Sequence, residues 1–199
     1  MNRSKLLLVC AVALGALLGA QVATATTVQK LTLHDLAKRS AGIAVARVED
    51  AMSSWDAGHK EIYTFYTLRV LESVKGGQGQ TTITLRQLGG VVDNIASIVP
   101  GMPDFRKGEE VVVFLTEKDR AGYPWVMGLQ QGKYTISTDR HGVKMVRNDL
   151  SGTELVSETG GRVTSTVQRD LPLSSFLDGI KTSLDVAGKV QVDPTTPTE

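Results

Sequence analysis

The sequence contains very little cysteine. Among its 199 residues there is one, Cys10, close to the amino terminus. Once an amino-terminal leader is removed the chain has none, which excludes disulfides, thiol chemistry and cysteine-ligated zinc. An exported domain without disulfides must be held together by its hydrophobic core, and roughly 150 residues are enough to build one. We therefore expect one domain.

The sequence also lacks an apolar run long enough to span a membrane comfortably. Arg3 and Lys5 precede an apolar run over Leu6–Leu18, and the small residues Ala23-Thr24-Ala25 follow. This order is typical of a secretory signal peptide, so we expect cleavage after Ala25 and a periplasmic or secreted mature protein. Because a span needs about 20 apolar residues, we expect no membrane insertion after cleavage.

A lipoprotein acylated at Cys10 is the alternative. Val9 argues against it, because a small residue is expected immediately before the acylated cysteine. Cleavage at Cys10 would also leave an apolar stretch on the mature protein.

Neither sign of charge prevails. The chain has 22 Lys and Arg against 21 Asp and Glu, for a net charge of +1, and loss of the two leader bases changes this to −1. Nucleic-acid and anionic-lipid binding surfaces are strongly basic. We therefore expect no nucleic-acid partner.

Residues typical of catalysis and metal binding are scarce and scattered. The three histidines, His34, His59 and His141, have no second ligand at metal-binding spacing. Gly76-Gly77-Gln78-Gly79 lacks the Lys-Ser/Thr ending of a phosphate-binding loop. Glu109-Glu110 would point to opposite faces of a strand, which does not suit paired acid-base chemistry. The sequence thus predicts no catalytic residue, no metal site and no cofactor.

A long alternating segment over Ile62–Gly76 dominates the remaining pattern. Its even positions are apolar or β-branched from Ile62 to Val70, which predicts a strand with one face toward a core. Fifteen extended residues would span roughly 50 Å, more than the width of a small domain. We therefore expect a bulge or sharp curl near Leu71, as in a strand that wraps around a small closed barrel.

The other elements follow from the same patterns. Thr32 and Asp35 form a capping box for a short helix that ends near Ser40 to Gly42. Glu49–Glu61 and Gly89–Phe105 are expected to be long polar or irregular loops. A carboxyl-terminal amphipathic helix is expected over 172–184. The other expected strands cover 43–48, 82–88, 111–115, 123–127, 133–137 and 143–146.

The predicted fold class is mainly β: a small closed OB-like β-barrel with a short N-terminal helix and a C-terminal amphipathic helix. Residues 1–25 form the signal peptide and 26–148 the barrel domain with its first helix. Residues 149–185 form an irregular connection and the helix packed on the barrel, and 186–199 a disordered tail.

Three short motifs carry a resemblance to a known family. They are Ala41–Val48, the segment from Phe65 to Lys75-Gly76, and Lys107-Gly108-Glu109-Glu110 followed by Val111–Leu115. In this order they resemble netrin-like modules, which include the tissue inhibitors of metalloproteinases and are OB-fold barrels. The chain also resembles uncharacterised exported bacterial proteins that share these turns and a Gln-Gly-Lys-aromatic segment, here Gln131–Tyr134.

The chain departs from the inhibitors at their functional end. Those inhibitors chelate the protease zinc through an amino-terminal cysteine that a disulfide holds in place. The mature chain would begin near Thr26 without cysteine, so the resemblance implies the barrel and not that inhibitory mechanism. We expect a non-enzymatic protein-binding module of the cell envelope or extracellular space, with an exported protease among the possible partners.

Four loop residues are the candidate partner contacts: Trp55, His59, Met102 and Phe105. Aromatic residues exposed on loops are favoured recognition anchors. Trp55 could equally fold back over the end of the barrel, and Met102 and Phe105 could plug its mouth.

Three other functions remain open. A protease inhibitor would act through a protruding loop, and an oligosaccharide-binding barrel would use an OB-fold face. A hydrolase would require Glu61, His59 and Asp104 to converge in a pocket.

Overall fold

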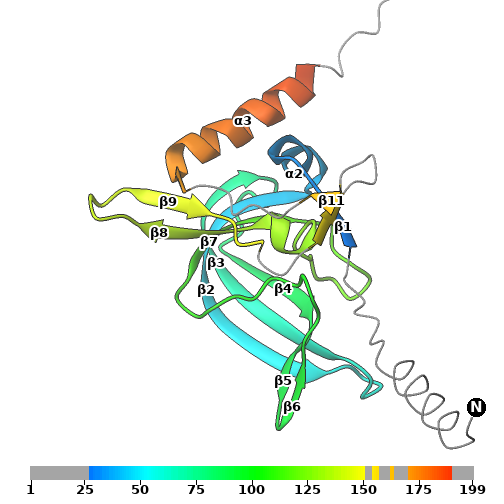
Figure 1. Ribbon diagram of the computed structural model, residues 1–199. Coiled ribbons are helices and arrows are strands. Elements are labelled where there is room, and N and C mark those ends of the chain that lie inside the picture. Colours follow the sequence, from blue (N-terminus) through cyan, green and yellow to red (C-terminus); the bar gives the residue numbers. More distant parts are fainter. Residues whose placement is uncertain (1–26, 151–153, 157–161, 164–169, 190–199) are drawn as a thin grey trace, which may run out of the picture.

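The computed structural model describes residues 27–150, 154–156, 162–163 and 170–189 (Figure 1). The expected signal peptide, lipoprotein cysteine and carboxyl-terminal tail beyond Lys189 lie outside these residues. The fold is mainly β with two α-helices. In chain order the elements are β1 (Thr27–Gln29), α2 (Leu33–Arg39), β2 (Gly42–Trp55), β3 (Ile62–Lys75), β4 (Thr82–Leu88), β5 (Gly90–Val92), β6 (Ile95–Ser97), β7 (Glu110–Leu115), the 3-10 helix η1 (Leu129–Gly132), β8 (Lys133–Thr138), β9 (Lys144–Arg147), β10 (Glu154–Val156), β11 (Arg162–Val163), β12 (Leu171–Pro172) and α3 (Leu173–Lys189).

The long hairpin of β2 and β3 is the centre of the fold. The two antiparallel strands pair from Ile43–Lys75 to Trp55–Ile62, with three shifts of register. Two shifts leave Leu71 and Val74 of β3 without an opposing residue, and the third does the same for Glu49 of β2. Each extra residue bends the strand and increases its twist. The bulge expected near Leu71 is therefore confirmed, and the hairpin curls as Figure 1 shows.

Seven strands form one sheet in the order β12-β9-β8-β7-β2-β3-β4. Its central strands, β2 and β7, are covered on both faces, as the continuous apolar run of β7 predicts. On one face α2 and α3 cover the sheet. Their apolar side chains meet those of the strands in a first core, formed by Leu36, Ala37, Ile43, Val45, Val112, Phe114, Tyr134, Ile136, Val146, Phe176, Leu177 and Ile180.

The opposite face of β2 and β7 lines the inside of the curl. There a second core is formed by Ala44, Ala46, Val48, Tyr66, Leu68, Leu85, Phe105, Val111, Val113, Leu115 and Val126. Successive residues of β2 therefore alternate between the two cores, and so do successive residues of β7. The small side chains of Ala44 and Ala46 leave space for the aromatic rings of the second core.

The sheet does not close into a barrel, so the predicted closed barrel is wrong. The expected strand 123–127 makes only one β-bridge, between Val126 and Leu115, and one backbone hydrogen bond to β4, from Arg86 N to Pro124 O at 3.2 Å. Pro124 has no N–H to donate. Toward β7 and the residues after it the segment keeps three backbone hydrogen bonds, Met127 N to Phe114 O, Thr116 N to Trp125 O and Asp119 N to Tyr123 O. The amides of Tyr123 and Trp125 donate to the Asp119 carboxylate and the Thr116 hydroxyl instead.

Helix α2 is fixed at both ends. Thr32 and Asp35 form the predicted capping box at its start. At its end the ammonium of Lys75, on β3, donates to the carbonyl oxygens of Ala37, Lys38 and Ser40 at 2.9, 3.0 and 2.5 Å. A cation at this position also interacts favourably with the helix dipole. Lys75 thus connects α2 to the end of the curled hairpin.

Three other segments differ from the sequence prediction. The expected loop Glu49–Glu61 is strand as far as Trp55, and the turn between β2 and β3 occupies only 56–61. The second expected loop contains the two-stranded hairpin of β5 and β6. The expected irregular connection contains β10, which pairs with β1 in parallel and with β11. Helix α3 was predicted from its apolar spacing and continues five residues further, to Lys189.

Candidate interaction surface

The first two predicted contact residues lie at the β2–β3 turn. The Trp55 ring stacks on the His59 ring, with 5.6 Å between centroids and 11° between planes. Asp56 orders this turn, because its carboxylate accepts the amides of Lys60 and Glu61. These amides hold the pKa of Asp56 below its usual value. Trp55 is half-buried, and its ring contact with His59 lies within its own turn.

Phe105 belongs to the second core. Its side chain is 4% exposed and packs on Tyr66, with 4.8 Å between ring centroids. The ammonium of Lys133 lies 4.7 Å from the Phe105 ring centroid. Met102 is half-buried. Phe105 therefore plugs the inside of the curl, which is the second of the two roles expected for it.

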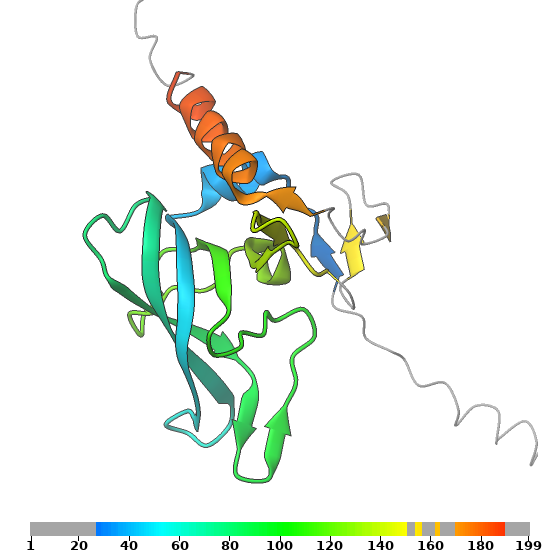
Figure 2. The same cartoon turned by 90° about the vertical axis from the view of Figure 1, so that its left-hand side faces the viewer.

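Three exposed apolar side chains lie on or just after the hairpin of β5 and β6. Val91 is 62% exposed, Ile95 53%, and Ile98, just after β6, 87%. Figures 1 and 2 show that this hairpin projects from the end of the curled sheet, beside the β2–β3 turn. Val91 pairs with Ala96 and Ile95 with Val92, so Val91 and Ile95 lie on opposite faces of the hairpin, and the protrusion exposes branched apolar side chains on both. Apolar side chains concentrated on one exposed element are typical of interaction sites.

The base of this hairpin is held firmly. The Thr64 hydroxyl donates to Gly89 O at 2.7 Å and lies 2.9 Å from the Ser53 hydroxyl. Gly90 lies so close to these hydroxyls that a Cβ atom would be 2.2 Å from Thr64 Oγ1, so only glycine fits. The hairpin thus leaves the sheet from a fixed position.

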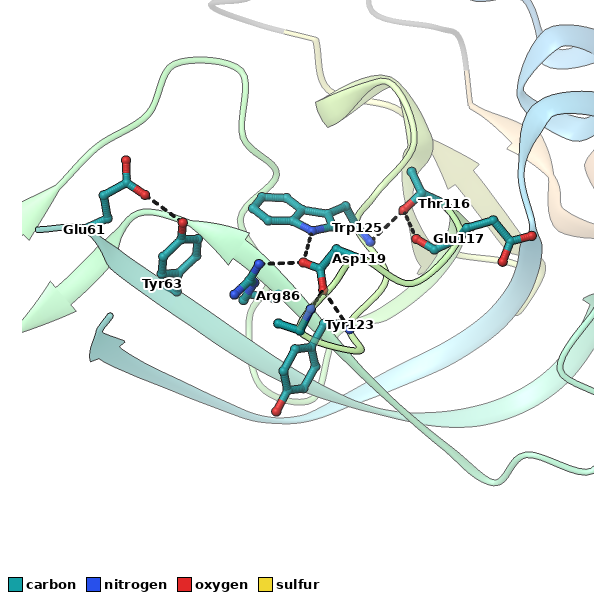
Figure 3. A network of polar contacts seen from close by, with 9 residues as sticks. Glu61, Tyr63, Arg86, Thr116, Glu117, Asp119, Tyr123 and Trp125 are labelled. Atoms are coloured by element: carbon teal, nitrogen blue, oxygen red, sulfur yellow. Dashed lines mark hydrogen bonds and ion pairs between the residues drawn. The ribbon is translucent and has the colours of Figure 1, made fainter. Parts of the chain in front are cut away.

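A second surface lies on the outer face of β3 and β4 (Figure 3). Arg86 extends between aromatic rings, with its guanidinium carbon 4.6 Å from the centroid of Tyr63 and 5.4 Å from that of Trp125. Its Nη2 atom donates to Asp119 Oδ2 at 2.5 Å. Phe65 packs edge-on against Tyr123 beside it, with 5.1 Å between centroids. We call these six residues the Arg86 cluster.

Asp119 is the centre of this network. Its carboxylate accepts hydrogen bonds from Trp125 Nε1 at 2.8 Å and from the amides of Ala121 and Tyr123 at 2.9 and 3.1 Å. The hydrogen bond from Trp125 contributes most to lowering the pKa of Asp119 to about 2, and the two amides and Arg86 lower it further. An ionised Asp119 therefore fixes the loop that carries Tyr123 and Trp125.

The sequence analysis missed the Arg86 cluster although a signal for it exists. Tyr63 and Phe65 fall on the odd positions of β3, opposite the buried face. Two aromatic residues on the outer face of a strand indicate a covering segment or a partner. In the structure the 119–125 loop covers them in part.

Two of the motifs behind the family resemblance meet in space. Glu109 pairs with Lys133 at 2.9 Å and accepts from the Thr135 hydroxyl at 2.7 Å. Burial opposes ionisation of Glu109, yet hydrogen bonds from the Arg106 amide, Thr135 and Lys133 hold its pKa below the usual value. The pair borders a polar cavity of about 270 Å³. Glu109 is therefore a half-buried structural anchor.

The rest of the Gln-Gly-Lys-Tyr motif is structural as well. The buried Gln131 side chain accepts the Leu31 amide at 2.7 Å and donates to Gln29 O at 2.9 Å. Gly132 has no space for a Cβ atom, which would lie 2.1 Å from Met127 O. Tyr134 packs on Phe176 in the first core. Each position of this motif thus has a packing role.

The three residues of the hydrolase alternative have separate partners. Glu61 accepts the Tyr63 hydroxyl at 2.6 Å, His59 stacks on Trp55, and Asp104 lies 3.5 Å from the Tyr66 hydroxyl. Within the described ranges, no cluster of three or more His, Cys, Asp or Glu side chains could hold a metal ion.

Comparison of the sequence with models of known protein families and with curated proteins gives no match. The netrin-like kinship therefore stays a prediction from the motifs. Among the helices that the structure describes, none is both long and apolar enough to cross a membrane.

Proposed function

We propose that this protein is an exported, non-enzymatic binding module that holds a protein partner through the β5–β6 hairpin. The observation that carries the proposal is the exposure of Val91, Ile95 and Ile98 on a protrusion whose base is fixed. Apolar residues presented on a rigid element lose little conformational freedom on binding. The leader-like amino terminus, the near-neutral charge and the absence of a catalytic motif in the sequence support this class of function.

The test uses the mature chain as an immobilised bait. Proteins captured from the envelope and culture fluid of the source cells are quantified for the parent chain and for a Val91→Ser, Ile98→Ser double variant. Val143→Ser is the matched control, because Val143 is 44% exposed on a different hairpin. A partner that uses the β5–β6 hairpin should be captured by the parent and the control and lost with the double variant.

The captured protein is then purified and its affinity measured directly. Truncation of a residue central to an interface commonly costs 2 kcal/mol or more, which is about 30-fold in Kd. Equal affinity of the parent and the double variant would contradict the proposal. Trp55→Ala, measured in parallel, shows whether the β2–β3 turn takes part; an unchanged affinity would exclude it.

The projecting hairpin also favours a second candidate, a protease inhibitor that acts through a loop. A narrow hairpin with a fixed base is a shape that can enter a protease cleft. The purified chain should then slow cleavage of a peptide substrate by a secreted metalloprotease, and Ile98→Ser should relieve the inhibition. Cleavage at an undiminished rate across a panel of such proteases would exclude it.

A further inference from the structure

The sheet remains open beyond its last strand, β4, and a cavity of about 400 Å³ lies at this opening. It lies between the edge of β4 at Thr82–Thr84 and the segments Leu115–Lys118 and Gly122–Pro124. This volume falls within the range typical of ligand sites. Because β4 is the last strand of the sheet, one wall of the cavity is a strand edge.

The backbone of this edge is available for pairing. Val70 N donates to Thr81 O, so the odd residues of β4 bond to β3. The even residues therefore direct their N–H and C=O groups the other way, as the bond from Arg86 N to Pro124 O shows. No described strand pairs with Thr82 or Thr84 on this side. Thr82 is exposed and Thr84 half-buried, so a strand edge at this place offers its unpaired N–H and C=O groups to an incoming chain.

The floor of the cavity is apolar. Ala44, Val70, Ile83 and Leu115 line it and belong to the second core or pack against it. A strand that enters here would direct every second side chain toward this floor and the others toward solvent. The site thus favours a segment with alternating apolar residues.

The charges at the cavity fit a neutral occupant. Its charged lining residues are Lys75, Glu117 and Lys118. The ammonium of Lys75 is committed to the carbonyl oxygens at the end of α2. The lining has a formal charge of +1, but Glu117 and Lys118 carry opposite charges and the ammonium of Lys75 is bound to the end of α2, so no cluster of like charges is available to select a phosphate or a carboxylate. Uncharged peptide amides match it better.

We propose that the cavity binds an extended peptide segment of another protein, which pairs with β4 at Thr82 and Thr84 and occupies the position of the missing barrel strand. Strand addition of this kind obtains affinity from main-chain hydrogen bonds and specificity from alternate side chains. The site is separate from the β5–β6 hairpin and does not depend on it.

The experiment starts from a displayed library of random ten-residue peptides, selected on the immobilised mature chain. Selected peptides are synthesised with blocked ends and titrated into isotope-labelled protein. The amide signals of Thr82 and Thr84 should shift, and the peptides should show apolar residues at alternate positions. A library that gives no binder, or binders that shift only other regions, would overturn the proposal.

Thr84→Pro removes the N–H that faces the cavity and leaves the bonds to β3 in place, because proline is tolerated where the amide points away from the sheet. Thr84→Val keeps this N–H and is the control. The Thr84→Pro variant should bind the peptide at least tenfold more weakly and Thr84→Val about as well as the parent. Equal binding by all three chains would refute the proposal.

A second measurement does not depend on the folding of any variant. The peptide is N-methylated at each position in turn, and the parent chain is titrated with each product. Methyl groups on amides that face β4 should weaken binding at least tenfold, and those on the alternating amides should not. A loss without this period of two would contradict strand addition. The double variant of the β5–β6 hairpin should bind the peptide normally, so this proposal and the proposed function fail separately.

Discussion

Replacing Asp119 with asparagine should destabilise the protein in a pH-dependent manner. The change keeps the size of the side chain but leaves only one oxygen, which can accept either the Trp125 indole N–H or the amides of Ala121 and Tyr123, because these bind different oxygens of Asp119. It removes the charge and leaves Arg86 without its ion pair. The loop of Tyr123 and Trp125 would therefore lose its main electrostatic anchor.

The size of the effect follows from the pKa. Folding lowers the pKa of Asp119 from 3.8 to about 2, which at full value corresponds to about 2 kcal/mol of stability. The Asp119 side chain is 22% exposed, so solvent screening reduces the contribution of this pKa shift to the stability. We expect the Asp119→Asn variant to lose about 1 kcal/mol at pH 7.

The sign of the pH dependence is fixed by the direction of the shift. Because the folded pKa of Asp119 lies below the unfolded one, the stabilisation is complete above about pH 4 and is lost as the pH falls toward 2. The difference between parent and variant should therefore be constant from pH 7 to about pH 5 and then shrink.

The assay is urea unfolding followed by far-UV circular dichroism at pH 7, 5, 4, 3 and 2. Asp93→Asn is the control, because Asp93 is an exposed carboxylate at the β5–β6 turn and asparagine also tolerates its φ of 53°. A variant as stable as the parent at pH 7, or a difference that does not shrink between pH 5 and pH 2, would refute the role assigned to Asp119.

Two other substitutions test the fold. Phe105→Ala should reduce the free energy of unfolding by about 3 kcal/mol, because the ring is buried against Tyr66; an unchanged thermal midpoint would place the ring outside the core. Gly76→Ala should cost at least about 1 kcal/mol in urea unfolding, because Gly76 has a φ of 59° and a Cβ atom would lie 2.6 Å from Ala41 O; equal midpoints for the two chains would show that the turn relaxes freely.

Much of the fold was predictable because local patterns and tertiary packing agree. The alternation of Ile62 to Val70 continues through one face of β3, and its interruption locates the bulge at Leu71. Thr32 and Asp35 fix the start of α2 through contacts within one turn of helix. Such features depend on residues that are neighbours in the chain, so the sequence contains them directly.

The sequence could not show how little the expected strand 123–127 would pair with β4. Tyr123–Met127 has strand-like composition, but its backbone hydrogen bond to β4 runs from Arg86 N to Pro124 O, and Pro124 has no N–H to return. Arg86 and Asp119 are 33 residues apart in the chain, and their pairing depends on where the 119–125 loop lies. The expected closed barrel was wrong for this reason.

The sequence assigns its candidate contacts to two loops, one of which is Gly89–Phe105. The large apolar residues that are exposed in this segment are Val91, Ile95 and Ile98. The sequence predicts contacts at Met102 and Phe105, but Phe105 is 4% exposed. Burial of Phe105 depends on Tyr66, which lies on a strand far away in the chain.

The alternation of β2 and β7 between two cores has a consequence for cooperativity. The two strands form a shared wall, so neither core can melt while the other keeps its packing. The helical layer and the interior of the curl should accordingly disappear in a single transition rather than as separate subdomains. A substitution that destabilises the first core beneath α3 should therefore also destabilise the second core inside the curl.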